Sequence, residues 1–113
     1  MRKQQRLITP REGFVRLVIY GMPDGAAYLF LYAHEEDGPC DDDERFPSVD
    51  EALDAAARRF GAVPDAWLDV PDPLPGCQHD WIAPVRVVGR ETGAPQWGCY
   101  ERLEEGRWVP FRA

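Results

Sequence analysis

Two apolar stretches early in the chain alternate in the way that β-strands do. In FVRLVIY (14–20) every second position is apolar, so one face of the stretch is apolar. AYLFLYAH (27–34) is apolar on both faces, which is typical of a central strand or of a strand that exposes one face to a partner. The turn-forming GMPDGA between them predicts a β-hairpin over 14–34.

A helix is predicted over about 49–60. Ser48 is placed as its N-cap, and Glu51 stands three residues later at the spacing of a capping box. Gly61 is placed to end the helix in a left-handed conformation. Apolar residues recur at helical spacing between these caps and form one stripe that predicts packing on a sheet. The stripe consists of Val49, Leu53, Ala56, Ala57 and Phe60.

The later half of the chain predicts four more short strands, over 66–70, 82–89, 97–103 and 107–111. The resulting order is β-β-α-β-β-β-β. Closely spaced strands favour antiparallel pairing, and a single helix cannot cover both faces of a parallel sheet. The predicted fold is therefore α+β, an antiparallel sheet of about six short strands with one helix packed on one face.

Domain organisation follows from the polar stretches. Residues 1–13 read as a polar arm, because Leu7 and Ile8 are their only apolar anchors apart from Met1. The proline-rich PDPLPGCQHD (71–80) could be a linker. The roughly 40 residues that follow it would bury little apolar surface alone, so one domain over 14–113 is preferred.

Composition excludes several classes of protein. No apolar run is long enough for a membrane span, and the basic opening MRKQQRLITP has no apolar signal-peptide core behind it. A cytoplasmic location is the simplest interpretation. The basic residues are almost all arginine, and asparagine is absent, a bias that suggests a GC-rich bacterial genome.

The net charge of −7 hides an asymmetry along the chain. Residues 1–33 carry +3, residues 34–80 carry −11 and residues 81–113 carry +1. Nucleic-acid binding depends on clustered positive charge that neutralises phosphates. The acidic middle argues against a nucleic-acid partner.

The most acidic stretch, DGPCDDDERF (37–46), has two interpretations. The spacing of its acids does not fit a calcium-binding EF-hand loop, so no metal is assigned. It fits a solvated strand-to-helix connection best, and a docking surface for a basic partner is the functional alternative. The candidate binding residues here are Asp41, Asp42, Asp43 and Glu44.

A second candidate site is CQHDW (77–81), which adds His79, Asp80 and Trp81 to the binding residues. Cys77 and His79 could ligate zinc with help from Cys40, Cys99 or His34, but zinc sites usually show paired ligands at short spacing. Cys77 as a nucleophile with His79 as base is also imaginable. A Pro-rich loop with His79 and Asp80 bonded to the backbone and Trp81 packed is favoured over both, and no cofactor is expected.

Large aromatic residues are concentrated in the later half of the chain. In so small a protein most are expected in the core. If several share an exposed sheet face, they would form an interface, self-association as a homodimer included. The residues are Trp67, Trp81, Trp97, Tyr100, Trp108 and Phe111.

No catalytic motif stands out in the sequence, and the only serine, Ser48, is committed to capping a helix. The leading hypothesis is a non-enzymatic bacterial protein that binds a protein partner with a basic surface, as an inhibitor or a toxin-neutralising protein does. The alternatives are a small-molecule or zinc-binding domain that uses the Cys77/His79 loop and the sheet aromatics, or a cysteine-dependent enzyme.

Overall fold

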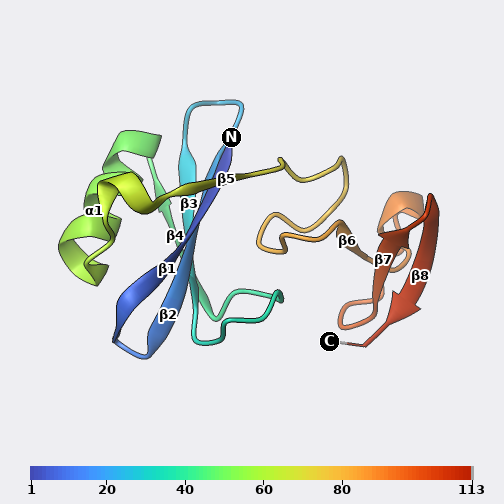
Figure 1. The fold of residues 1–113 in the computed structure, drawn as a ribbon. Coiled ribbons are helices and arrows are strands. Elements are labelled where there is room, and N and C mark those ends of the chain that lie inside the picture. Colours follow the sequence, from blue (N-terminus) through green and yellow to red (C-terminus); the bar gives the residue numbers. More distant parts are fainter. Residues whose placement is uncertain (113) are drawn as a thin grey trace. The chain divides into compact units, whose positions relative to one another are not determined.

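The computed structural model describes residues 1–112, which contain eight β-strands, one α-helix and two short 3₁₀ helices. The chain divides into two compact units, Met1–Asp72 and Pro73–Ala113 (Figure 1). Both units contain an antiparallel sheet, so the predicted α+β class is confirmed, with two sheets in place of one. The boundary falls in the proline-rich stretch considered as a linker. A single domain over 14–113 stays a prediction.

The first unit is built on a five-stranded antiparallel sheet with the order β4-β3-β2-β1-β5. Consecutive strands pair with each other from β1 to β4, and β5 returns to pair with β1. The strands are β1 (Arg2–Arg11), β2 (Phe14–Gly21), β3 (Ala27–Tyr32), β4 (Asp42–Phe46) and β5 (Leu68–Val70).

Two of these strands differ from the sequence-based expectation. The segment 1–13, expected to be a polar arm, contains β1, whose Gln5 and Leu7 are buried. The strand-to-helix connection expected within 37–46 is a strand over its second half, β4, which pairs with β3. Both sequences are polar and resemble loops, but pairing with an apolar neighbouring strand overrides weak β-propensity.

The start of β1 is tied to the end of the first unit. The Arg2 Nε donates to the carbonyl oxygen of Pro71 at 2.9 Å, and the N-terminal ammonium lies 3.2 Å from the Asp72 carboxylate. Burial lowers the pKa of Arg2, while Tyr32, Asp37 and Asp72 act to raise it. An arginine keeps its charge under such shifts, so this strand end stays cationic.

The helix α1 (Val49–Phe60) has the predicted bounds and the predicted caps. The Ser48 hydroxyl accepts from the Glu51 N–H at 3.1 Å. Gly61 takes the left-handed conformation at φ 72° and donates to last-turn carbonyls. Of the predicted stripe, Ala56 and Phe60 are buried, whereas Val49 and Leu53 are only partly buried. Ala52 and Ala55, which lie outside the predicted stripe, are buried as well.

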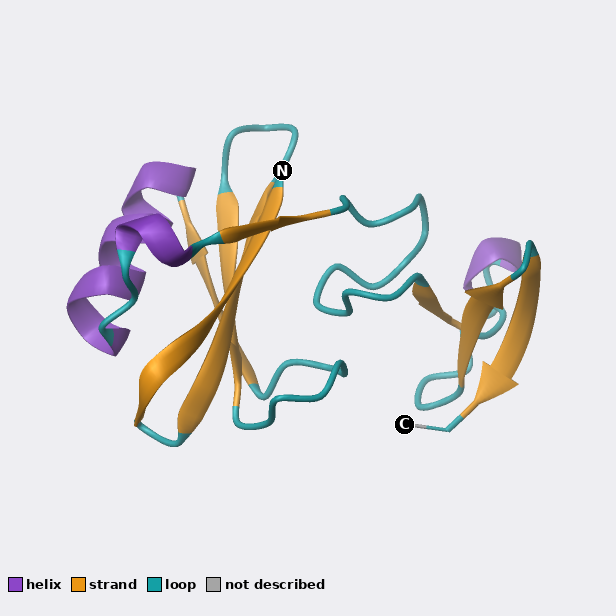
Figure 2. Cartoon of the chain, viewed as in Figure 1, coloured by secondary structure: helices purple, strands orange, loops and turns teal. Residues whose placement is uncertain are grey.

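One face of the five-stranded sheet lies under α1, as Figures 1 and 2 show. The alternating positions of β2 and β3 bring four aliphatic side chains to this face, where they are almost completely buried. Burial of this apolar surface is the main source of stability that the unit can draw on. The core consists of Leu7, Leu17, Ile19, Ala27, Leu29, Leu31, Ala52, Ala56, Phe60 and Ala62.

The second unit contains a three-stranded antiparallel meander, β6-β7-β8. Its strands lie within or near three of the predicted ranges, and they are β6 (Val85–Val87), β7 (Tyr100–Glu104) and β8 (Arg107–Phe111). On one side Trp81 packs against Tyr100 and Phe111, with ring centroids 5.9 and 5.6 Å away.

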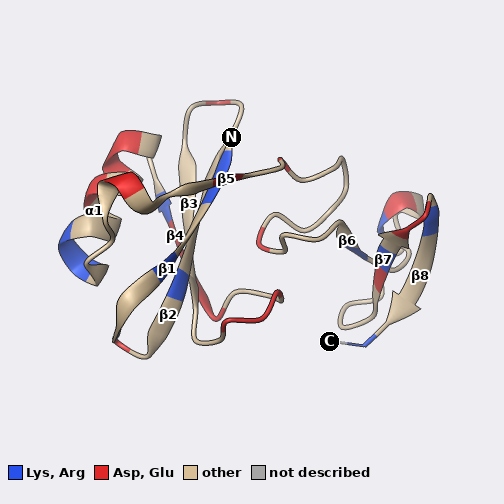
Figure 3. Ribbon diagram, viewed as in Figure 1, with Lys and Arg blue, Asp and Glu red and all other residues tan. Residues whose placement is uncertain are grey.

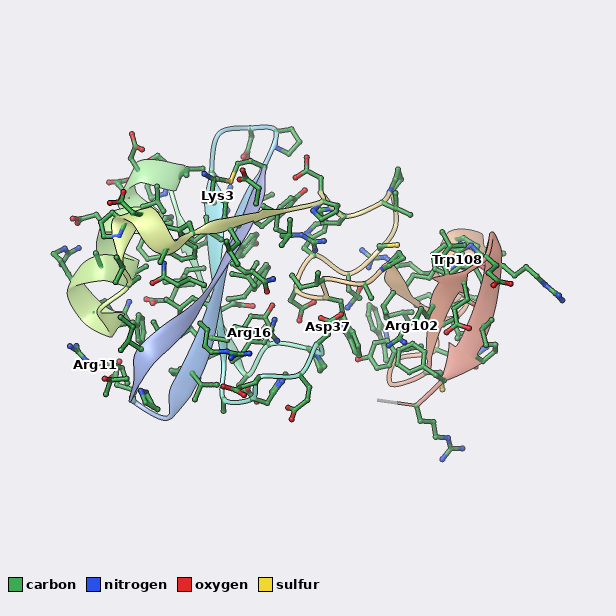
Figure 4. The ribbon with its side chains drawn as sticks, viewed as in Figure 1. Lys3, Arg11, Arg16, Asp37, Arg102 and Trp108 are labelled. Atoms are coloured by element: carbon green, nitrogen blue, oxygen red, sulfur yellow. The ribbon has the colours of Figure 1, made fainter. Side chains whose placement is uncertain are left out.

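The other side of the meander carries a charged cluster. Arg86 pairs with Glu101 at 2.5 Å, and its guanidinium lies 3.8 Å from the ring centre of Trp108, which Figure 4 labels. The arginine is thus held by an ion pair and a cation–π contact at once.

The N-cap of α1 gives a first testable expectation. Replacing Ser48 with alanine leaves the Glu51 N–H without its acceptor and should lower the free energy of unfolding by about 1 kcal/mol. Ser48→Asp keeps an acceptor at the same place and should stay close to the wild type. Urea denaturation followed by far-UV circular dichroism measures both. Equal losses in the two variants would show that the cap contributes nothing specific.

The turn between β6 and β7 gives a second expectation. Two of its glycines both have a positive φ but differ in the room available for a Cβ atom. A Cβ on Gly89 (φ +80°) would lie 2.3 Å from the Ala94 carbonyl oxygen, whereas a Cβ on Gly93 (φ +77°) meets nothing within 4 Å. Gly93→Ala should cost about 1–2 kcal/mol for its backbone strain. Gly89→Ala should cost roughly 1–3 kcal/mol more, because the backbone must shift. Denaturation followed by tryptophan fluorescence compares them, and equal costs would contradict the turn geometry.

Candidate functional site

The predicted acidic residues lie on and just before the edge strand β4. Asp41 precedes the strand, and Asp42, Asp43 and Glu44 are its first three residues. Asp41, Asp42 and Asp43 are exposed and Glu44 is half-buried. In Figure 3 the ribbon is red, the colour of Asp and Glu, along much of the loop that leads into β4. The candidate residues are therefore accessible, on a strand that has a neighbour on one side only.

The register of β4 divides its carboxylates between the two faces of the sheet. Glu44 stands opposite Leu29, on the face covered by α1, and its carboxylate forms an ion pair with Arg59 of the helix. Asp43 stands opposite Phe30 and so lies on the other face. Asp42 shares the helix side with Glu44. A flat partner surface that packs on one face of the sheet would therefore contact only some of these three carboxylates.

Asp41 closes the loop that joins β3 to β4. Its carboxylate accepts from the Ala33 N–H at 2.6 Å and lies 3.6 Å from the Nε2 of His34. The Asp41 N–H donates to the carbonyl oxygen of Leu31 at 2.8 Å. These bonds give Asp41 a structural task that the sequence did not reveal.

The side chains of His34 and Arg16 contact backbone carbonyl oxygens of the same loop. The two ring nitrogens of His34 lie 2.8 and 3.0 Å from the carbonyl oxygens of Glu36 and Pro39. The Arg16 guanidinium donates to the Glu36 carbonyl at 2.9 Å and stacks 3.8 Å from the ring centre of Tyr32. A lone arginine inside the apolar FVRLVIY was the one signal that could have suggested such a role.

Asp42 and Asp43 are engaged least. The Asp42 carboxylate accepts from the N–H of Asp43 at 2.9 Å, which satisfies one backbone group of the strand. Over residues 1–112, neither carboxylate has an ion-pair partner within 4.0 Å. Their charge is left for solvent or for a partner.

The second predicted site, CQHDW (77–81), lies in the second unit. His79 is exposed and Asp80 half-buried, and Trp81 is 4% exposed against its aromatic neighbours. The segment is ordered by backbone bonds, from Cys77 N–H to the Leu74 carbonyl and from Gln78 N–H to the Val85 carbonyl. Trp81 is packed, as expected for a Pro-rich loop. Bonding of His79 and Asp80 to the backbone stays a prediction.

The three cysteines form no disulfide within residues 1–112, and Cys40 is half-buried, Cys77 buried and Cys99 exposed. Within the part of the chain that the structure describes, no group of three or more histidine, cysteine or acidic side chains is placed to hold a metal ion. Among the same residues no helix is long and apolar enough to cross a membrane.

The aromatic residues of the later half are divided between core and surface. Trp81 is buried, whereas Trp97 is 72% exposed. The aromatic face of β3, left open by the sequence, has Phe30 at 6% and Tyr32 at 0% exposure.

Comparison with protein-family models, with curated proteins and with solved structures finds no match to this chain.

The contacts indicate that Asp41 stabilises the fold and that Asp43 does not, and the stability of alanine variants tests this difference. Asp41→Ala removes the acceptor of the Ala33 N–H and should lower the free energy of unfolding by about 1 kcal/mol. Asp43→Ala touches no side-chain bond and should change it by less than about 0.5 kcal/mol. Urea denaturation of the two variants side by side is the measurement. A larger loss for Asp43→Ala would reverse the assignment.

Proposed function

We propose that this chain is a non-enzymatic protein-binding domain of a bacterial cytoplasmic protein, which presents the edge strand β4 to a basic surface on a protein partner. Inhibition or neutralisation of a toxin is the kind of task such binding performs. The observation that carries the proposal is the pair Asp42 and Asp43, which are exposed and have no cationic partner within residues 1–112.

Electrostatics supports a binding role for these carboxylates. Adjacent like charges repel each other, and a partner that brings positive charge removes this repulsion. A concentrated field also raises the rate of encounter with a partner of opposite charge. Residues 34–80, the segment of the sequence that contains β4, carry a net charge of −11.

The positions of the two carboxylates restrict the directions from which a partner can contact both of them. Asp42 and Asp43 point to opposite faces of the sheet, so a partner that reads both must meet the edge of β4. An open strand edge can also pair its backbone with an extended segment. A basic strand or an extended basic loop along β4 would satisfy both requirements.

The zinc-binding and cysteine-enzyme alternatives receive no specific support from the contacts of residues 1–112. Cys77 is 2% exposed, which is unfavourable for a nucleophile that must reach a substrate.

Charge reversal at the edge tests the proposal. Asp42→Lys with Asp43→Lys should abolish capture of the partner from an extract of the producing cells, or weaken a purified partner's affinity at least tenfold. Lysine is common on edge strands, so the double variant should fold. Wild-type binding should also weaken as salt is raised, because exposed charges are screened.

The matched control applies the same charge change elsewhere. Glu104→Lys with Glu105→Lys alters two exposed residues at the β7–β8 turn and should leave binding unchanged. If the β4 variant captures the same proteins as the wild type, or if both variants lose them equally, the edge of β4 is not the binding site.

A further inference from the structure

A groove of about 360 Å³ opens beside α1 in the first unit. Leu53 and Ala57 form its helix wall, and Ala62, Pro64 and Trp67 form the opposite wall. Its volume lies within the range of small-molecule sites, and mostly apolar walls with a few polar groups are typical of them. At roughly 30 Å³ for each water-sized atom, it has room for about a dozen non-hydrogen atoms.

The walls of the groove are fixed before any ligand arrives. Gly61 reverses the chain after α1, and the Gln5 side chain then holds Val63 by two bonds, donating to its carbonyl at 3.0 Å and accepting from its N–H at 2.7 Å. Gln5 is 3% exposed, so this anchor is protected from water. A preformed site avoids the cost of ordering its walls on binding.

Two charged groups, Lys3 and Asp54, stand at the rim, and they are not equally available. The Asp54 carboxylate is 2.7 Å from the Nε of Arg58 on the same helix, which offsets part of its negative charge. Lys3 extends from β1, as labelled in Figure 4, and its one ion-pair partner within residues 1–112 is Asp69, at 3.5 Å. The Asp69 side chain is 86% exposed, so this pair is weak.

The groove therefore offers apolar walls, one of them aromatic, and an ammonium group at the rim that can still donate hydrogen bonds. We propose that it binds a small arylalkyl monocarboxylate, with the ring against Trp67 and Ala57 and the carboxylate at Lys3. This binding site lies apart in sequence from the edge of β4 and does not depend on the proposed partner.

The test uses 3-phenylpropionate as the probe, with 3-phenylpropanamide as its neutral analogue and acetate as an anion that lacks the ring. Titrations of ¹⁵N-labelled protein should show saturable shifts at the resonances of Ala57, Ala62 and Trp67. The amide analogue should bind about tenfold more weakly, and acetate should produce no saturable shift at these residues.

Variants at the rim test the contribution of the Lys3 charge to binding, and a variant of the helix wall tests the contribution of the groove itself. Lys3→Met should remove the preference for the carboxylate over the amide, and Lys3→Arg should retain it. Asp69→Asn should strengthen carboxylate binding, because it releases Lys3. Ala57→Leu fills the groove at a half-buried helix position that tolerates leucine, and it should abolish binding of both compounds.

Three results would overturn the proposal. They are an absence of saturable shifts at the groove in the folded wild type, equal affinity for the carboxylate and the amide, or unchanged affinity in an Ala57→Leu variant whose remaining resonances match the wild type.

Discussion

The apolar face of the five-stranded sheet has to be covered, and one helix is too narrow to do it alone. Five strands at their normal spacing span roughly 19 Å, whereas a helix with its side chains is only about 10–12 Å wide. The fold meets this constraint in two ways. Ala52 and Ala56 let α1 approach the sheet closely, and the chain after Gly61 brings Ala62 and Trp67 onto the remaining surface. The groove beside α1 lies at the join between these two covers.

The elements that could be predicted are those whose signals are local. Helix α1 was placed correctly because its N-cap, its left-handed terminator and its apolar stripe all lie within fourteen residues, from Ser48 to Gly61. Strands β2 and β3 could be predicted from their apolar sequences alone. Strand β4 could not, since DDERF has only weak β-propensity and becomes a strand by pairing with the edge of β3. The same holds for the polar β1, which is ordered by partners on both sides.

In the candidate site too, local sequence signals did not predict the roles of single residues. The acidic run could be found from the sequence, but the separate roles of its members could not. Asp41 is structural because a turn returns it to Ala33, eight residues earlier, and Glu44 is neutralised by Arg59, fifteen residues later. Only tertiary contacts distinguish these two from Asp42 and Asp43. The charge of β4 also has a protective effect, because acidic edge strands of two copies repel each other when they approach.

The pairing of β5 with β1 has a consequence for the order in which the first unit assembles. Strands β1 to β4 form a meander of sequence neighbours, and such local contacts form quickly. By contrast, Arg2–Gln4 pair with Leu68–Val70, so this side of β1 has no strand partner until most of the unit has been synthesised. During that interval the nascent sheet exposes a strand that carries Arg2, Lys3 and Arg6. Their like charges disfavour pairing of this edge with the same edge of a second copy, until β5 covers it at Arg2–Gln4.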